Sequence, residues 1–167
     1  MTLNACPGCG GLFARSEGAT HAYMHSSAGC WAKYGDVLAR EYANPRLTAT
    51  HRLSVDTYAV QHPGSHDRRA IQSVGLHLAR LMLQLENPRP PRETNEVMLG
   101  LGPSKSSLPF LEPPASFGLT VADIPLDGSL DDHAIAVRTW AEDAWSAWGR
   151  HHDFIRSWAA SALRHRL

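Results

Sequence analysis

Apolar residues recur at helical spacing along most of this chain, and the first stripe follows a pair of serines. Within residues 29–42 the stripe consists of Trp31, Tyr34, Leu38 and Tyr42. This spacing puts the four side chains on one face of a helix. Ser26 and Ser27 suit its N-cap and Asn44-Pro45 its end, so we expect a helix from Gly29 to Tyr42.

The same periodicity predicts helices over 49–61, 68–86 and 129–148, and a last helix that begins at 151–153. The stripe of the third helix consists of Val74, His77, Leu78, Leu81 and Leu85, so His77 is expected on its buried side. No segment alternates apolar and polar residues over the length of a strand. We therefore predict an all-α fold with about five helices around one core, in a single domain spanning 1–167.

Residues 87–118 break this pattern because they hold seven of the eleven prolines. We interpret them as a long Pro-rich loop with at most a short apolar turn at 97–101. Such a loop is either a functional lid or a mobile surface crossing. The expected domain thus has an N-terminal segment (1–30), three helices (31–86), this loop, and C-terminal helices (119–167).

All three cysteines lie within the first thirty residues. Cys6-Pro7-Gly8-Cys9 is a CxxC knuckle whose tight turn can direct two thiolates at one tetrahedral zinc ion. We predict a structural zinc site formed by Cys6, Cys9 and Cys30 with His21 as the fourth ligand, and His25 as the alternative to His21. A redox pair usually follows a strand, which is not expected here, and inert cysteines are the remaining alternative.

A second group of polar residues falls where the helical pattern predicts the core. Its members are His51, Asp56, His62, His77 and His152. Buried groups of this kind need partners, and helical bundles often use them to build metal sites. They are candidate catalytic residues, which would hold a second divalent metal or use an Asp56-oriented histidine as a general base. The alternative is that each is an ordinary core residue, with Asp56 paired to Arg52.

The overall charge excludes one class of partner. The formal net charge is zero and the pI is about 7.2, which argues against a nucleic-acid-binding face. The chain has no apolar run long enough for a membrane span and no secretory signal, so we expect a cytoplasmic protein without a membrane partner. It also has no phosphate-binding glycine loop or dinucleotide fingerprint. The oligomeric state is left open.

Three groups of short sequence motifs are more specific than composition or charge. They are CPGCG at 6–10 with TH at 20–21 and GCW at 29–31; HRLSVDTYAVQHPG at 51–64 with QSV at 72–74 and HL at 77–78; and TVAD at 120–123, WSAW at 145–148 and HH at 151–152. Together they resemble an uncharacterised family of small bacterial proteins, a domain of unknown function. The resemblance implies no activity. It implies that the family pattern includes His51, Asp56, Gln61, His62, Gln72, Ser73, His77 and His152.

Two functions are compatible with these observations. The first is a zinc-binding helical protein with a structural Cys3His site, which acts as a binding or scaffold protein for an unidentified protein or small molecule. The second is a metal- or His/Asp-dependent enzyme, a hydrolase, lyase or group transferase acting on a small molecule through the inner cluster. A second metal that survives loss of the cysteines would favour the enzyme.

Overall fold

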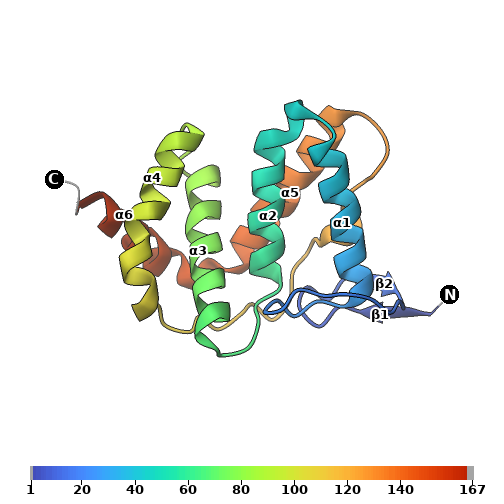
Figure 1. Cartoon of the computed structure of the whole chain (residues 1–167), viewed down its shortest axis with the longest axis horizontal. Helices are drawn as coiled ribbons and strands as arrows, with labels where there is room; N and C mark the ends of the chain where they lie inside the picture. The colour runs from blue at the N-terminus through green and yellow to red at the C-terminus, as the bar shows by residue number, and fades with distance from the viewer. Residues whose placement is uncertain (1, 165–167) are drawn as a thin grey trace.

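The computed structural model describes residues 2–164, apart from the side chain of Leu163. Within them the six α-helices are α1 (Ala28–Tyr42), α2 (Thr48–Gln61), α3 (Arg68–Leu85), α4 (Pro91–Leu101), α5 (Leu130–Ala147) and α6 (His152–Arg164). A hairpin precedes them, in which β1 (Leu3–Ala5) pairs antiparallel with β2 (Leu12–Ala14). Helix α2 packs against α1, α3 and α5, and the hairpin lies beside α1 (Figure 1). The mostly helical class predicted from the sequence is confirmed.

Local signals in the sequence explain where the helices begin. Ser27 caps α1 by accepting a hydrogen bond from the backbone of Cys30, and Asp67 caps α3 by accepting from Arg69 and Ala70. The buried face of α1 is rotated by about one residue from the predicted stripe, as its buried residues are Cys30, Tyr34, Val37 and Glu41. Tyr42, the last residue of the predicted stripe, is 74% exposed. Glu41 therefore enters the core in its place.

Residues 87–118 differ from the expected loop because α4 and a 3-10 helix, η2 (Gly102–Ser107), occupy much of this range. Two prolines start α4, Pro90 at the N-cap and Pro91 in the first turn. Proline is compatible with these positions because the first N–H groups of a helix have no partner within it. Thr94, Val97 and Leu101 form the buried stripe of α4. The hairpin strands were not predicted because three residues are too few to show alternation.

Helix α2 lies between two hydrophobic clusters, and this explains why most of its second half is buried. The larger cluster joins α3, α4, α5 and α6 and includes Val60 of α2. The smaller one joins the knuckle, α1, and the 3-10 helix η3 (Val121–Asp123) to α5, and it includes Tyr58. Two further 3-10 helices, η1 (Pro45–Leu47) and η4 (Gly149–His151), connect neighbouring helices. Across residues 2–164, every helix is too short or too polar to cross a lipid bilayer.

Candidate metal centre

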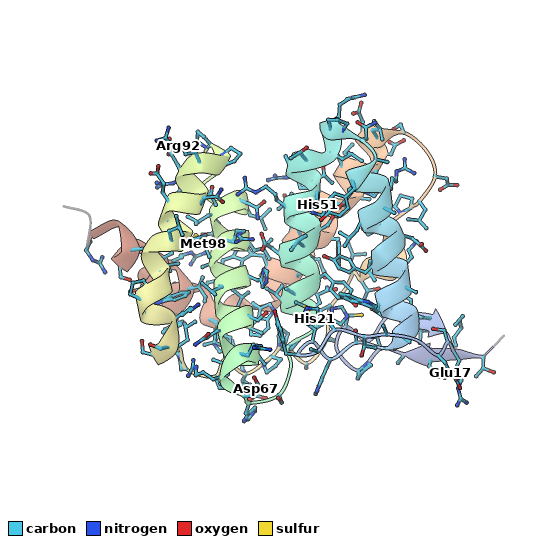
Figure 2. All side chains as sticks on the ribbon, in the orientation of Figure 1. Glu17, His21, His51, Asp67, Arg92 and Met98 are labelled. Carbon is cyan, nitrogen blue, oxygen red and sulfur yellow. The ribbon has the colours of Figure 1, made fainter. Side chains whose placement is uncertain are left out.

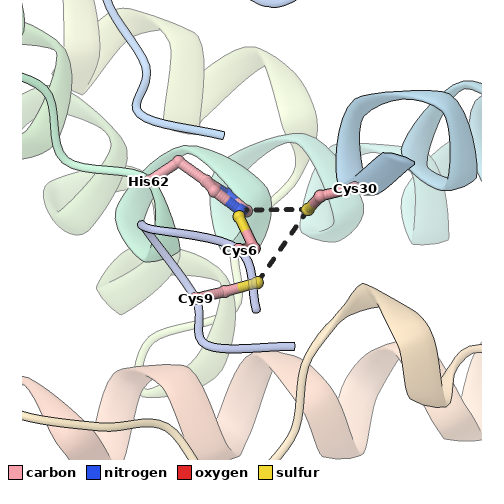
Figure 3. Close-up of side chains that lie close together, drawn as sticks. All are labelled: Cys6, Cys9, Cys30 and His62. Atoms are coloured by element: carbon pink, nitrogen blue, oxygen red, sulfur yellow. Dashed lines mark hydrogen bonds between the residues drawn. The ribbon is translucent and has the colours of Figure 1, made fainter. Parts of the chain in front are cut away.

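The three cysteines meet His62 where the hairpin turn contacts the ends of α1 and α2 (Figure 3). One ligand atom from each residue lies within 4.8 Å of all the others, and the four side chains are buried. Cys30 Sγ is 3.9 Å from Cys9 Sγ and 3.3 Å from His62 Nε2. The cysteines are free thiols. Among the residues described, this is the only group of three or more His, Cys, Asp or Glu with a spacing suited to a metal ion.

Three segments that are distant in the sequence provide these four side chains. Cys6 and Cys9 belong to the turn between β1 and β2, which two backbone hydrogen bonds close, from Cys6 N to Gly11 O and from Gly10 N to Cys6 O, at 2.8 and 2.9 Å. Gly10 has a φ of +77°, which glycine adopts without strain. Cys30 lies in the first turn of α1, and His62 is the C-cap residue of α2.

Gly8 allows the turn to pack directly against the end of α2. A Cβ atom at this position would lie 2.2 Å from the carbonyl oxygen of His25 and 2.6 Å from Cδ2 of His62. Both separations are well below van der Waals contact. The absence of a side chain at Gly8 therefore lets Cys6 and Cys9 approach His62.

Hydrogen bonds orient the four side chains. The Nδ1 atom of His62 donates to the carbonyl oxygen of Tyr58 at 2.7 Å, so Nε2 presents its lone pair to the sulfur atoms. The backbone N–H of Gly11 donates to Cys9 Sγ and that of Ser27 donates to Cys6 Sγ, each at 3.4 Å. Such donors stabilise thiolates. These hydrogen bonds therefore hold Nε2 of His62 and the sulfur atoms facing one another.

The acidities of the three thiols differ because they are crowded together. Hydrogen bonds with Cys30 and Cys9 hold the pKa of Cys6 far below its usual value. The pKa of Cys30 is raised well above its usual range by hydrogen bonds with Cys6 and Cys9 and by burial. Cys30 lowers the pKa of Cys9, but Cys6 and burial outweigh it and raise this pKa to about 12. A first thiolate is thus stabilised by its neighbours, whereas further buried negative charges need a cation.

The donor set and its spacing fit zinc. Tetrahedral zinc with Zn–S bonds of ~2.3 Å and Zn–N bonds of ~2.0–2.1 Å places sulfur pairs about 3.8 Å apart and sulfur–nitrogen pairs about 3.6 Å apart. Here the Cys9 and Cys30 sulfur atoms are 3.9 Å apart, Cys30 Sγ and His62 Nε2 are 3.3 Å apart, and all pairs lie within 4.8 Å. A disulfide would instead require an S–S distance of about 2 Å. Three thiols and one imidazole, all buried, are typical of a closed structural zinc site.

His21, the fourth ligand expected from the sequence, lies outside this group. Its ring makes edge contacts with Tyr23 and Trp31, at centroid distances of 4.3 and 5.5 Å, and its Nδ1 accepts from the backbone of Tyr23. The alternative, His25, is exposed. His62 takes this place because the end of α2 reaches the knuckle. Its separation of 32 residues from Cys30 hid it from an argument based on local spacing.

The five residues of the predicted inner cluster do not meet at one point. His62 joins the cysteines, whereas His51 lies near the other end of α2, as the label in Figure 2 shows. His51 Nδ1 is 3.0 Å from Glu41 Oε2, and the other carboxylate oxygen of Glu41 contacts Ser54 and lies 3.1 Å from His133 Nε2. No sequence motif pointed to Glu41 or His133. The one available signal for Glu41 was its position four residues after the apolar Val37, which puts both side chains on one face of the helix.

The remaining three residues form two further contacts. His152 stacks on Trp145 at a centroid distance of 3.8 Å, and its Nε2 donates to the Trp145 carbonyl at 2.8 Å. Asp56 pairs with His77 Nδ1 at 2.7 Å and accepts from Gln84 at 2.6 Å, instead of pairing with Arg52. The structure therefore brings Asp56 and His77 together and separates both from His51, His62 and His152.

Comparison with known proteins places the chain in a family. Residues 4–149 match the profile of a family of unknown function, DUF5946, and the chain belongs to this family. The resemblance to a domain of unknown function is thereby confirmed. Neither curated proteins nor solved structures give a match.

Proposed function

We propose that this member of the family is a zinc-binding protein in which Cys6, Cys9, Cys30 and His62 hold one structural zinc ion. The observation that carries the proposal is the convergence of four buried ligand atoms within 4.8 Å of one another. All four positions of a tetrahedral ion are then taken by protein atoms, which leaves no site for substrate or water. The role that follows is structural.

The proposed ion would attach the N-terminal hairpin to the helices. The hairpin that carries the knuckle is small and its strands have three residues each, so it has little core of its own. Metal binding supplies folding free energy to such a segment. We propose on this basis that the protein acts as a binding or scaffold protein, whose zinc-attached face has a fixed shape. The closed ligand set favours this role over metal catalysis at the same centre.

Metal content of single variants tests the proposal. We expect about one zinc per chain, measured by elemental mass spectrometry, in the wild-type protein and in His21→Asn and His25→Asn. Cys6→Ser, Cys30→Ser and His62→Asn should lose most of it and unfold at lower temperature, since metal binding is coupled to folding. His62→Cys replaces imidazole by another zinc ligand and should recover zinc binding, which separates ligand loss from a general packing defect.

Cobalt(II) substitution gives a second measurement, because thiolate ligands produce charge-transfer absorption. This absorption should appear in the wild-type and His21→Asn proteins. Full zinc content in His62→Asn, or its loss in His21→Asn, would show that the fourth ligand is wrongly assigned. A wild-type protein that contains no zinc when its three thiols are reduced would overturn the proposal as a whole.

A further inference from the structure

The contact between Asp56 and His77 lies beside a groove, away from the cysteines. The side chain of Asp56 is fully buried in α2, whereas that of His77 in α3 is 22% exposed. Because Nδ1 of His77 contacts the carboxylate, Nε2 lies on the opposite edge of the ring. A carboxylate in this position fixes the tautomer and orientation of the imidazole. His77 is therefore a partly exposed, rigidly held imidazole.

The groove runs between α3 and α4 and has a volume of about 560 Å³. This volume falls in the range of small-molecule sites, about 300–1,000 Å³. Its apolar part is formed by Leu76, Met98 and Leu99, and its polar part by His77, Arg80 and Lys105. Figure 2 labels Met98 on α4, the helix beside α3. Apolar and cationic side chains therefore both face the groove, and the apolar ones lie mainly on α4.

The polar part of the groove carries positive charge. Arg80 and Lys105 line it together with no acidic residue. Asp56, behind the wall, is shared among His77, Gln84 and Arg80, and its contact with Arg80 is long, at 3.5 Å. Within the described residues, Nε of Arg80 is buried without a hydrogen-bond partner. Arginine is well suited to carboxylate and phosphate groups. The guanidinium of Arg80 is therefore only partly satisfied within the protein, and Lys105 adds a second cation to the groove.

A purely structural role explains part of this arrangement. A buried Asp56 that joins α2 to α3 needs His77 and Gln84 as partners. It does not need Lys105 or the apolar surface of α4. Both line the groove, and an anion with an apolar body would use both.

We propose that the groove between α3 and α4 binds a small organic anion. Its acidic group, a carboxylate or a phosphate, contacts Arg80 and Lys105 beside the ring of His77. Its apolar body packs on Leu76, Met98 and Leu99. The site shares no residue with the proposed zinc centre, so the two proposals succeed or fail separately.

Nuclear magnetic resonance with simple probes tests the site. Met98 reports on the groove through its methyl group, and Met24 and Met82, which do not line it, serve as internal references. The probes are phenylacetate and phenyl phosphate, with inorganic phosphate as the acidic group alone and benzyl alcohol as the apolar body alone. We expect either or both of the first two to shift the Met98 methyl and His77 imidazole signals at millimolar concentration, and the last two to shift them at least about tenfold less.

Charge variants connect such shifts to the groove. Lys105→Gln should weaken binding of the effective probe by about two- to fivefold, the usual value of an exposed charge pair. Lys33→Gln removes the same charge from α1, outside the groove, and should leave the affinity unchanged. Arg80→Gln should weaken binding about tenfold or more, and Arg80→Lys, which keeps the charge, should weaken it less.

Three results would overturn the proposal. The first is no shift at Met98 and His77 with either phenylacetate or phenyl phosphate. The second is an equal shift with benzyl alcohol, which would make the groove an apolar surface only. The third is equal affinity in wild-type, Lys105→Gln and Arg80→Gln proteins, which would place the probe elsewhere. Arg80→Gln counts only if its thermal unfolding remains cooperative, and Lys105→Gln decides the question otherwise.

Discussion

Replacing Gly8 with alanine adds one methyl group where the knuckle contacts α2. The new Cβ would lie 2.2 Å from the His25 carbonyl oxygen and 2.6 Å from His62 Cδ2. Relieving these contacts requires shifts of about 1 Å, and overpacking of this kind costs about 1–3 kcal/mol. The lower entropy of the unfolded alanine chain returns about 0.4–1 kcal/mol. We expect a net loss of about 1–2 kcal/mol, which corresponds to about 2–8 °C in melting temperature.

Zinc binding should respond to the same change. Metal sites tolerate ligand displacements of about 0.2 Å, so a shift of about 1 Å between Cys6–Cys9 and His62 should weaken zinc binding. Gly18→Ala is the matched control, because its Cβ would meet nothing within 4 Å. Urea unfolding in chelator measures the steric cost, and the additional difference in saturating zinc measures the loss of metal affinity. If Gly8→Ala equals Gly18→Ala in both conditions, the packing of the knuckle on His62 is not as described.

Two further changes test other parts of the structure. Gln61→Leu leaves the Leu119 carbonyl and the Trp140 indole N–H without their hydrogen bonds of 2.7 and 2.9 Å, so urea unfolding should show a loss of about 2–4 kcal/mol in the free energy of unfolding. The control is Gln72→Leu, at a less buried position. A loss in Gln61→Leu no larger than in this control would contradict the expectation. The hydrogen bond from Arg156 holds the pKa of Glu86 below its ordinary value of about 4.3. This ion pair therefore stabilises the folded protein above that pH, and the stabilisation is lost as the pH falls through the lower pKa of Glu86 in the folded state. Arg156→Gln should remove this part of the acid loss, which is small because both side chains are partly exposed. Parallel urea midpoints for the two proteins from pH 6 to pH 3 would contradict this explanation.

Helical periodicity predicted the long helices well, and three of them, α1, α3 and α5, begin at a capping side chain. Ser27 and Asp67 accept hydrogen bonds from the first turns of α1 and α3, as their side-chain chemistry suggests. Helix α4 was not predicted because its prolines are more typical of a loop. The prolines stand at the start of the helix, where proline is tolerated, and Val97 and Leu101 follow at helical spacing. This pattern was the available evidence for a helix.

The candidate metal centre was predictable only in part. The CxxC spacing identifies Cys6 and Cys9, and the next cysteine completes the thiols. His62 could not be chosen over His21 from spacing, because its approach depends on how α2 packs against the knuckle. Asp56 and His77 were correctly placed on facing helices. Glu41 was overlooked because a shift of one residue in the phase of α1 moves it from surface to core.

The position of His62 has a consequence for synthesis of the chain. The first three ligands emerge from the ribosome within the first thirty residues, but the fourth follows Cys30 by 32 positions, at the end of α2. A nascent chain that stops before α2 can offer zinc only three thiols, which other thiol-seeking metals or oxidants can also reach. Completion of the proposed site would thus await α2, and a bound ion could attach the hairpin only after that helix has been made.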